Sequence, residues 1–87
     1  MHYKTMTLEL LKEEFPTLHE SLRVRRELLK ALDRYSLYFK ESHDQRKEEL
    51  LRLRPQSHPD QTASEALEIA IEDLKAKFSA DELHGLT

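Results

Sequence analysis

The chain of 87 residues contains no cysteine and no tryptophan, and it has one glycine and three prolines. Without cysteine there is no disulfide framework and no thiolate chemistry, which fits a reducing compartment. A β-rich fold needs many tight turns, and tight turns favour glycine and proline. The low content of both residues therefore argues against a β-rich fold and favours long helices.

Long apolar runs are also absent. No run approaches the roughly 18 residues that a membrane-spanning helix needs. Residues 1–6 lack the charged start and apolar segment of a signal peptide. We therefore expect neither a membrane span nor a secretion signal, and we predict a cytoplasmic protein.

Charge is abundant but unevenly distributed. Charged residues make up 36% of the chain and apolar residues 38%, and the net charge is −3. Residues 1–55 hold twelve Lys and Arg against ten Asp and Glu, whereas residues 56–87 hold two against seven. A basic front and an acidic end could attract each other, within one chain or between two.

The strongest pattern is an apolar stripe from Leu18 to Leu53, in which neither glycine nor proline occurs. Its members alternate at spacings of four and three residues, which is typical of a helix that packs against other helices. The stripe predicts a long central helix over about 17–54, begun by a capping box of Thr17 and Glu20. The stripe consists of Leu18, Leu22, Arg25, Leu29, Leu32, Ser36, Phe39, His43, Arg46, Leu50 and Leu53.

The segment 40–49 has no apolar side chain, so the long helix could continue through it or bend there. Its Lys, Glu, Gln and Arg residues are strong helix formers, and Lys40 and Asp44 are spaced to form an ion pair on one helix face. These features favour a continuous helix.

Two shorter helices complete an all-α fold with a single helical domain over residues 1–87. Leu8, Leu11 and Phe15 share a face of a short N-terminal helix at about 8–15, which ends before Pro16. A capping box of Thr62 and Glu65 predicts a C-terminal helix at about 62–78, antiparallel to the central one. We expect residues 55–61 to connect the helices and residues 1–6 and 80–87 to be frayed.

A continuous helix over 17–54 would be about 54 Å long, whereas a compact chain of this size has a radius of gyration of about 12 Å. Two short helices cannot cover so long a stripe, so the sequence predicts a dimeric helical bundle. The function that follows is a small non-enzymatic interaction protein, such as an adaptor, regulator or assembly subunit, which binds a second copy or another helical protein. The predicted interface consists of Leu22, Leu29, Leu32, Tyr35, Phe39, Leu67, Ile71, Leu74 and Phe78.

Catalytic and metal-binding patterns are absent from the sequence. No two of the five histidines have the spacing of a metal site. His43 lies in the apolar register, where a neutral, hydrogen-bonded histidine is the simplest interpretation. We therefore predict no catalytic residue, no cofactor and no metal.

A basic stripe supports an alternative function in nucleic-acid binding. Arg23, Arg26, Lys30 and Arg34 would follow one helix face, where they could track phosphates. Acidic residues are interleaved with them, however, so a solvated helix face is the simpler explanation of the pattern.

The tripeptide His58-Pro59-Asp60 supports a second alternative. It resembles the signature loop of J-domain co-chaperones, which lies between two antiparallel helices and stimulates an Hsp70 ATPase. Pro55 and the longer preceding helix depart from that family's pattern. The same residues suit an ordinary turn, because Pro59 restricts φ and Asp60 can accept a hydrogen bond from the following backbone.

Overall fold

The computed structural model describes residues 2–56 and 58–85. Within these residues the chain forms four α-helices and no strand. The helices are α1 (Tyr3–Glu14), α2 (Pro16–Val24), α3 (Leu28–Leu53) and α4 (Pro59–Gly85). The all-α prediction is confirmed. Parts of the segments expected to be frayed or to connect helices, namely Met1, Ser57, Leu86 and Thr87, lie outside the described residues.

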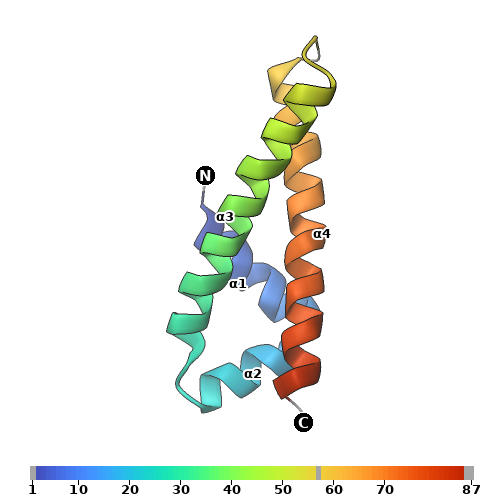
Figure 1. Cartoon of the computed structure of the whole chain (residues 1–87). Helices are drawn as coiled ribbons and strands as arrows, with labels where there is room; N and C mark the ends of the chain where they lie inside the picture. The colour runs from blue at the N-terminus through green and yellow to red at the C-terminus, as the bar shows by residue number, and fades with distance from the viewer. Residues whose placement is uncertain (1, 57, 86–87) are drawn as a thin grey trace.

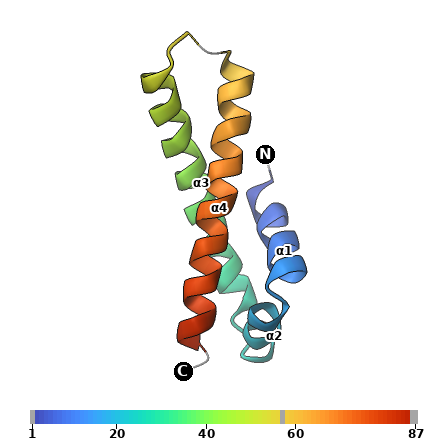
Figure 2. The same ribbon diagram turned by 90° about the vertical axis from the view of Figure 1, so that its right-hand side faces the viewer.

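The helices α3 and α4 form an antiparallel hairpin that runs the length of the molecule, which measures 48 × 24 × 18 Å (Figure 1). The helices α1 and α2 pack beside its lower part, and the end with the α3–α4 connection stands clear of them (Figures 1 and 2). The radius of gyration of 14.4 Å exceeds the roughly 12 Å of a compact chain because the hairpin projects.

Proline begins two of the helices. Pro16 and Pro59 are the first residues of α2 and α4, a position where the missing N–H has no helical partner to lose. The predicted capping boxes are therefore wrong. No side chain caps α2, and the Thr62 hydroxyl donates to the His58 carbonyl from within α4.

The predicted long helix over 17–54 is also wrong, because the chain turns at residues 25–27. The amide of Arg26 donates to the carbonyl of Arg23, and the amide of Glu27 donates to that of Leu22. This is the Schellman pattern that ends helices, with Arg26 at a φ of 58° where glycine is usual. A non-glycine residue there costs roughly 1–2 kcal/mol, which packing of the reoriented α2 must offset.

The helices α1 and α4 are both longer than the sequence predicted. The chain is helical from Tyr3, because the Tyr3 ring packs edge-on against Phe39 at 5.3 Å between ring centroids. At the other end, α4 continues to Gly85, and Asp81 in its last turns accepts a hydrogen bond from the Tyr35 hydroxyl. Burial, followed by this bond, raises the pKa of Tyr35 far above its ordinary value. The segment 40–49 is helical throughout and includes the expected Lys40–Asp44 pair at 3.6 Å.

The core is a single apolar cluster between the lower part of the hairpin and the two N-terminal helices. Four aromatic contacts tie these helices together, including Phe15–Phe78 at 5.3 Å and Tyr35–Phe78 at 4.7 Å between ring centroids. The buried members are Leu11, Leu18, Leu22, Ala31, Leu32, Tyr35, Phe39, Ala70, Leu74 and Phe78.

Most of the predicted interface is therefore occupied within one chain. Six of its nine residues are buried in this core, and Leu67 and Ile71 pack partly against it. Only Leu29 is largely exposed, at 78%. The apolar stripe does not require a second chain, because α3 is shorter than predicted and α1, α2 and α4 together cover it. The apolar stripe therefore no longer supports the predicted dimer.

Candidate interaction surface

A partly exposed apolar hollow lies between α1 and α4. Met6 and Leu10 of α1 face Ile71 of α4 across a groove of about 180 Å³, and the buried Phe39 ring lies at its floor. Figure 2 shows the two helices side by side. We call this hollow the α1–α4 groove. Its lining residues are Met6, Glu9, Leu10, Glu13, Phe39 and Ile71.

Helical periodicity explains why α1 has apolar residues left for the groove. Thr7 and Leu11 point directly into the core and are fully buried. Met6 and Leu10 each precede one of these residues, so their side chains lie about 100° around the helix and reach the edge of the core. They are only partly buried. A second apolar row therefore runs beside the buried one.

The sequence interpretation missed this row because it began the helix at residue 8. Tyr3, Met6 and Leu10 are spaced at i, i+3 and i+7, which is itself a helix signal. Extending the helix to Tyr3 would have placed Met6 and Leu10 on a common flank. The predicted face of Leu8, Leu11 and Phe15 packs against the core as expected.

Acidic side chains border the groove on both helices. Glu9 and Glu13 line it on α1. On α4, the exposed Glu68 lies three residues before Ile71 on a neighbouring part of the helix surface, and Glu72 contacts Lys75. Within the described part of the chain, Glu9, Glu13 and Glu68 form no ion pair. The border therefore presents negative charge that the protein itself leaves largely uncompensated.

One lysine interrupts this border at the lower end of the groove. The Lys75 Nζ lies 3.2 Å from a carboxylate oxygen of Glu14 and 3.7 Å from one of Glu72. The hydrogen bond with Glu14 is the main cause that raises the pKa of Lys75. Because Lys75 is engaged by these two carboxylates, it bridges α1 and α4 and leaves the other border carboxylates open.

The predicted basic stripe does not form one row. The turn at Arg26 places Arg23 on α2 and Lys30 and Arg34 on α3. Arg23 donates to Glu20 at 2.9 Å, and this bond is the main cause that lowers the pKa of Glu20. Nucleic-acid binding through these residues stays a prediction. The continuous helical stripe on which it was based does not form.

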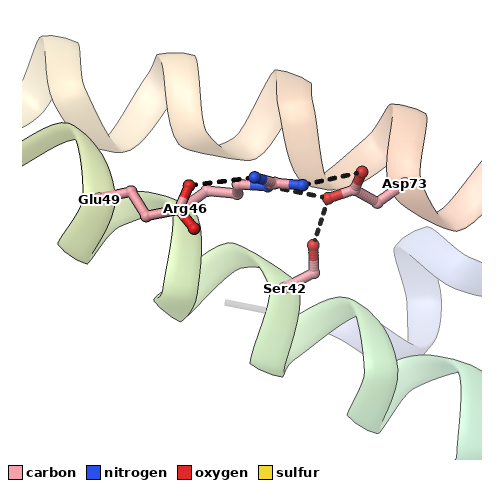
Figure 3. A network of polar contacts seen from close by, with 4 residues as sticks. All are labelled: Ser42, Arg46, Glu49 and Asp73. Atoms are coloured by element: carbon pink, nitrogen blue, oxygen red, sulfur yellow. Dashed lines mark hydrogen bonds and ion pairs between the residues drawn. The ribbon is translucent and has the colours of Figure 1, made fainter.

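A polar cluster joins α3 to α4 on another side of the hairpin (Figure 3). Asp73 accepts hydrogen bonds from the Ser42 hydroxyl at 2.7 Å and from Arg46 Nε at 3.1 Å, and Arg46 also donates to Glu49 at 3.0 Å. Burial alone would raise the pKa of Asp73, but these bonds and the Arg46 charge lower it overall. The four side chains satisfy one another, so the cluster is best explained as a tie between helices.

His43 is buried and hydrogen-bonded on both sides. Its Nε2 lies 3.3 Å from the Ala63 carbonyl oxygen, and its Nδ1 lies 2.9 Å from the Tyr3 hydroxyl. Because a carbonyl only accepts, Nε2 carries the hydrogen, and in the neutral ring Nδ1 accepts from Tyr3. These contacts give His43 a structural role at the point where α1 meets the hairpin.

The tripeptide His58-Pro59-Asp60 lies at the α3–α4 connection, between antiparallel helices, as the J-domain resemblance implies. Pro59 and Asp60 already belong to the first turn of α4, and the Asp60 side chain is 97% exposed. A co-chaperone role stays a prediction, to be tested by stimulation of an Hsp70 ATPase and its loss in His58→Gln.

The described residues contain no group of three or more histidine or carboxylate side chains that could hold a metal ion. None of the helices described is both long and apolar enough to cross a membrane. In comparisons with known proteins, no family model, no curated protein and no solved structure matches the chain.

Proposed function

We propose that this chain is a small non-enzymatic interaction protein that binds a helical partner in the α1–α4 groove. The observation that carries the proposal is the row of Met6, Leu10 and Ile71, which lines the groove and is only partly buried by the core. The function is the one expected from the sequence, but the surface is different, because most of the predicted interface is used within the chain.

The shape of the surface supports a helical partner. Two walls formed by neighbouring helices, with an apolar floor between them, suit the insertion of the apolar side chains of a third helix. The upper end of the hairpin stands clear of α1, so a helix longer than the groove could continue along it (Figure 1). A second copy of this chain is one possible occupant and would satisfy the predicted homodimer.

The test is site-specific cross-linking in the cells that produce the protein. A photoreactive amino acid at position 10 should form a cross-link to one discrete partner. The same amino acid at position 37 is the matched control, because Leu37 lies on α3 and is 55% exposed. Equal products from both positions, or none from position 10, would contradict the proposal.

The mass of the product and a variant complete the experiment. A product of twice the chain mass that contains only this protein identifies a homodimer, and any other mass identifies a different partner. Leu10→Asp should abolish the complex while the far-ultraviolet circular dichroism stays helical. If that variant does not fold, Leu10→Ala serves in its place, with a weakened complex as the expected result.

A further inference from the structure

We infer that the partner in the α1–α4 groove is a basic amphipathic helix. This inference rests on the proposed function and adds the chemistry of the partner to it. It is carried by charge complementarity, since Glu9 and Glu13 line the groove on α1 and Glu68 lies one helical turn before Ile71 on α4. These three carboxylates have no ion-pair partner within the described residues.

The spacing of the carboxylates suits a helix that lies along the groove. Glu9 and Glu13 are four residues apart on α1, and Glu68 and Glu72 are four residues apart on α4. Each pair is therefore separated by about 6 Å along its helix. A partner helix between these two rows would present Lys or Arg at intervals of three or four residues on both of its flanks.

The apolar row sets the pattern between those flanks. Met6 and Leu10 are also four residues apart and lie on the flank of α1 that faces Ile71. A partner side chain such as Leu every three or four residues would reach the groove once per turn. The combined pattern is a Leu stripe with basic residues on either side.

The chain's own exposed apolar segment matches this pattern less well. Leu51 and Leu53 at the end of α3 are exposed and lie beside Arg52 and Arg54. Glu48 and Glu49 lie three and two residues before Leu51, however, and would meet the acidic border of a second copy. A different protein with a uniformly basic helix is the better complement.

The experiment uses two blocked helical peptides of about eighteen residues, long enough to form a helix. The first has Leu at helical spacings of three and four and Lys at the other positions. The second has Glu in place of every Lys. Fluorescence anisotropy with the full chain at low salt should show binding of the Lys peptide at least about tenfold tighter than that of the Glu peptide.

Variants of the protein locate the binding. The double variant Glu9→Lys, Glu13→Lys should weaken the Lys peptide by about tenfold or more, and added salt should weaken it in the wild type. The matched control is Glu41→Lys, Glu48→Lys, which makes the same charge change on the opposite face of α3 from Phe39. It should leave binding unchanged apart from a small long-range effect.

The outcomes separate the inference from the proposed function. Leu10→Asp should remove binding of either peptide. If both peptides bind equally and Leu10→Asp abolishes both, the groove is the site but the basic partner is wrong. Equal weakening by the two double variants, or no binding of the Lys peptide, would also overturn the basic partner. Binding that is indifferent to Leu10→Asp would count against the groove itself.

Discussion

The two ends of the α3–α4 hairpin are held together by different interactions. The base, residues 3–41 and 74–85, contains α1, α2 and the part of the hairpin that holds most of the apolar core. Its core includes aromatic rings from three of its helical segments and from the residue between α1 and α2. The arm, residues 42–53 and 59–73, consists of two helices whose buried contact residues are small or polar. These residues are Ser42, His43, Thr62, Ala66 and Ala70, of which His43 and Ala70 also contact the base.

The contrast shows how a chain with few aromatic residues distributes its stability. Five of its six aromatic residues are buried or partly buried in the base, and the sixth, Tyr38, is exposed. An aromatic side chain buries about 150–250 Å², far more than an alanine can. The arm instead relies on close approach of small residues and on polar ties such as Arg46–Asp73. Amide hydrogen exchange should therefore show that the arm opens at a lower free energy than the base.

The largest expected effect is in the base. Phe78→Ala removes a fully buried ring that contacts Phe15 and Tyr35, and it should lower the free energy of unfolding by about 3–5 kcal/mol. Urea unfolding followed by circular dichroism measures the change. The control is Leu83→Ala in the same helix, at a side chain that is 70% exposed, where a change within about 0.5 kcal/mol is expected. Similar losses in both variants would show that the rings do not dominate the base.

The next effect tests close packing in the arm. Ala66 is fully buried between the helices, so Ala66→Leu should push them apart and cost about 1–3 kcal/mol. The matched control is Ala76→Leu, an exposed position on the same helix, with an expected change within about 0.5 kcal/mol. A thermal or urea unfolding series measures both. If Ala66→Leu were neutral, the arm would have room between its helices and small residues would not be required there.

The buried residues of the base were largely predictable from the sequence. That other helices of the same chain cover them was not. Six of the nine residues that the apolar spacing assigned to an interface are buried in the core, because helical periodicity reports which face is buried. The spacing carries no information on what covers that face. The prediction assigned the cover to a second chain because it made α1 and α4 too short and the central helix too long.

The reasons for those errors are local. Arg26 adopts a left-handed conformation that Arg rarely takes, so nothing in the stretch from Arg25 to Glu27 signals a turn. The Schellman hydrogen bonds and the packing of α2 stabilise it only in the folded chain. The groove was missed for a related reason, since Met6 and Leu10 lie on one flank of a helix only when α1 begins at Tyr3. The polar tie of Ser42, Arg46 and Asp73 depends on the register of the hairpin, which no local pattern encodes.

A smaller effect concerns the polar tie of the arm. Asp73→Asn removes the charge that Ser42 and Arg46 bind, and it should cost about 1–2 kcal/mol at neutral pH. The pKa of Asp73 is lowered in the folded state, so its carboxylate is protonated less readily in the folded chain than in the unfolded chain. The stabilisation by the Asp73 charge is therefore complete above the ordinary Asp pKa of about 4. It is lost as the pH falls through the folded-state pKa of Asp73.

This pH dependence can be measured by comparing urea unfolding at neutral pH and at about pH 3. The wild type should lose more stability between these conditions than Asp73→Asn does. Glu48→Gln is the control, because Glu48 is exposed and forms no ion pair within the described residues. It should show the same acid loss as the wild type. An Asp73→Asn chain with an undiminished acid loss would mean that Asp73 is not a source of the pH dependence.

The smallest effect is expected at the tip of the arm, where Arg54 pairs with Glu65. Their side chains are 47% and 34% exposed, so water screens the pair and it should contribute about 0–1 kcal/mol. A double-mutant cycle of Arg54→Ala and Glu65→Ala measures the coupling, which should fall further at high salt. A coupling above about 2 kcal/mol that persists in salt would exceed what exposed ion pairs give. In that case the tip would be locked by charge about as firmly as a ring contact holds the base, and the contrast between the two regions would fail.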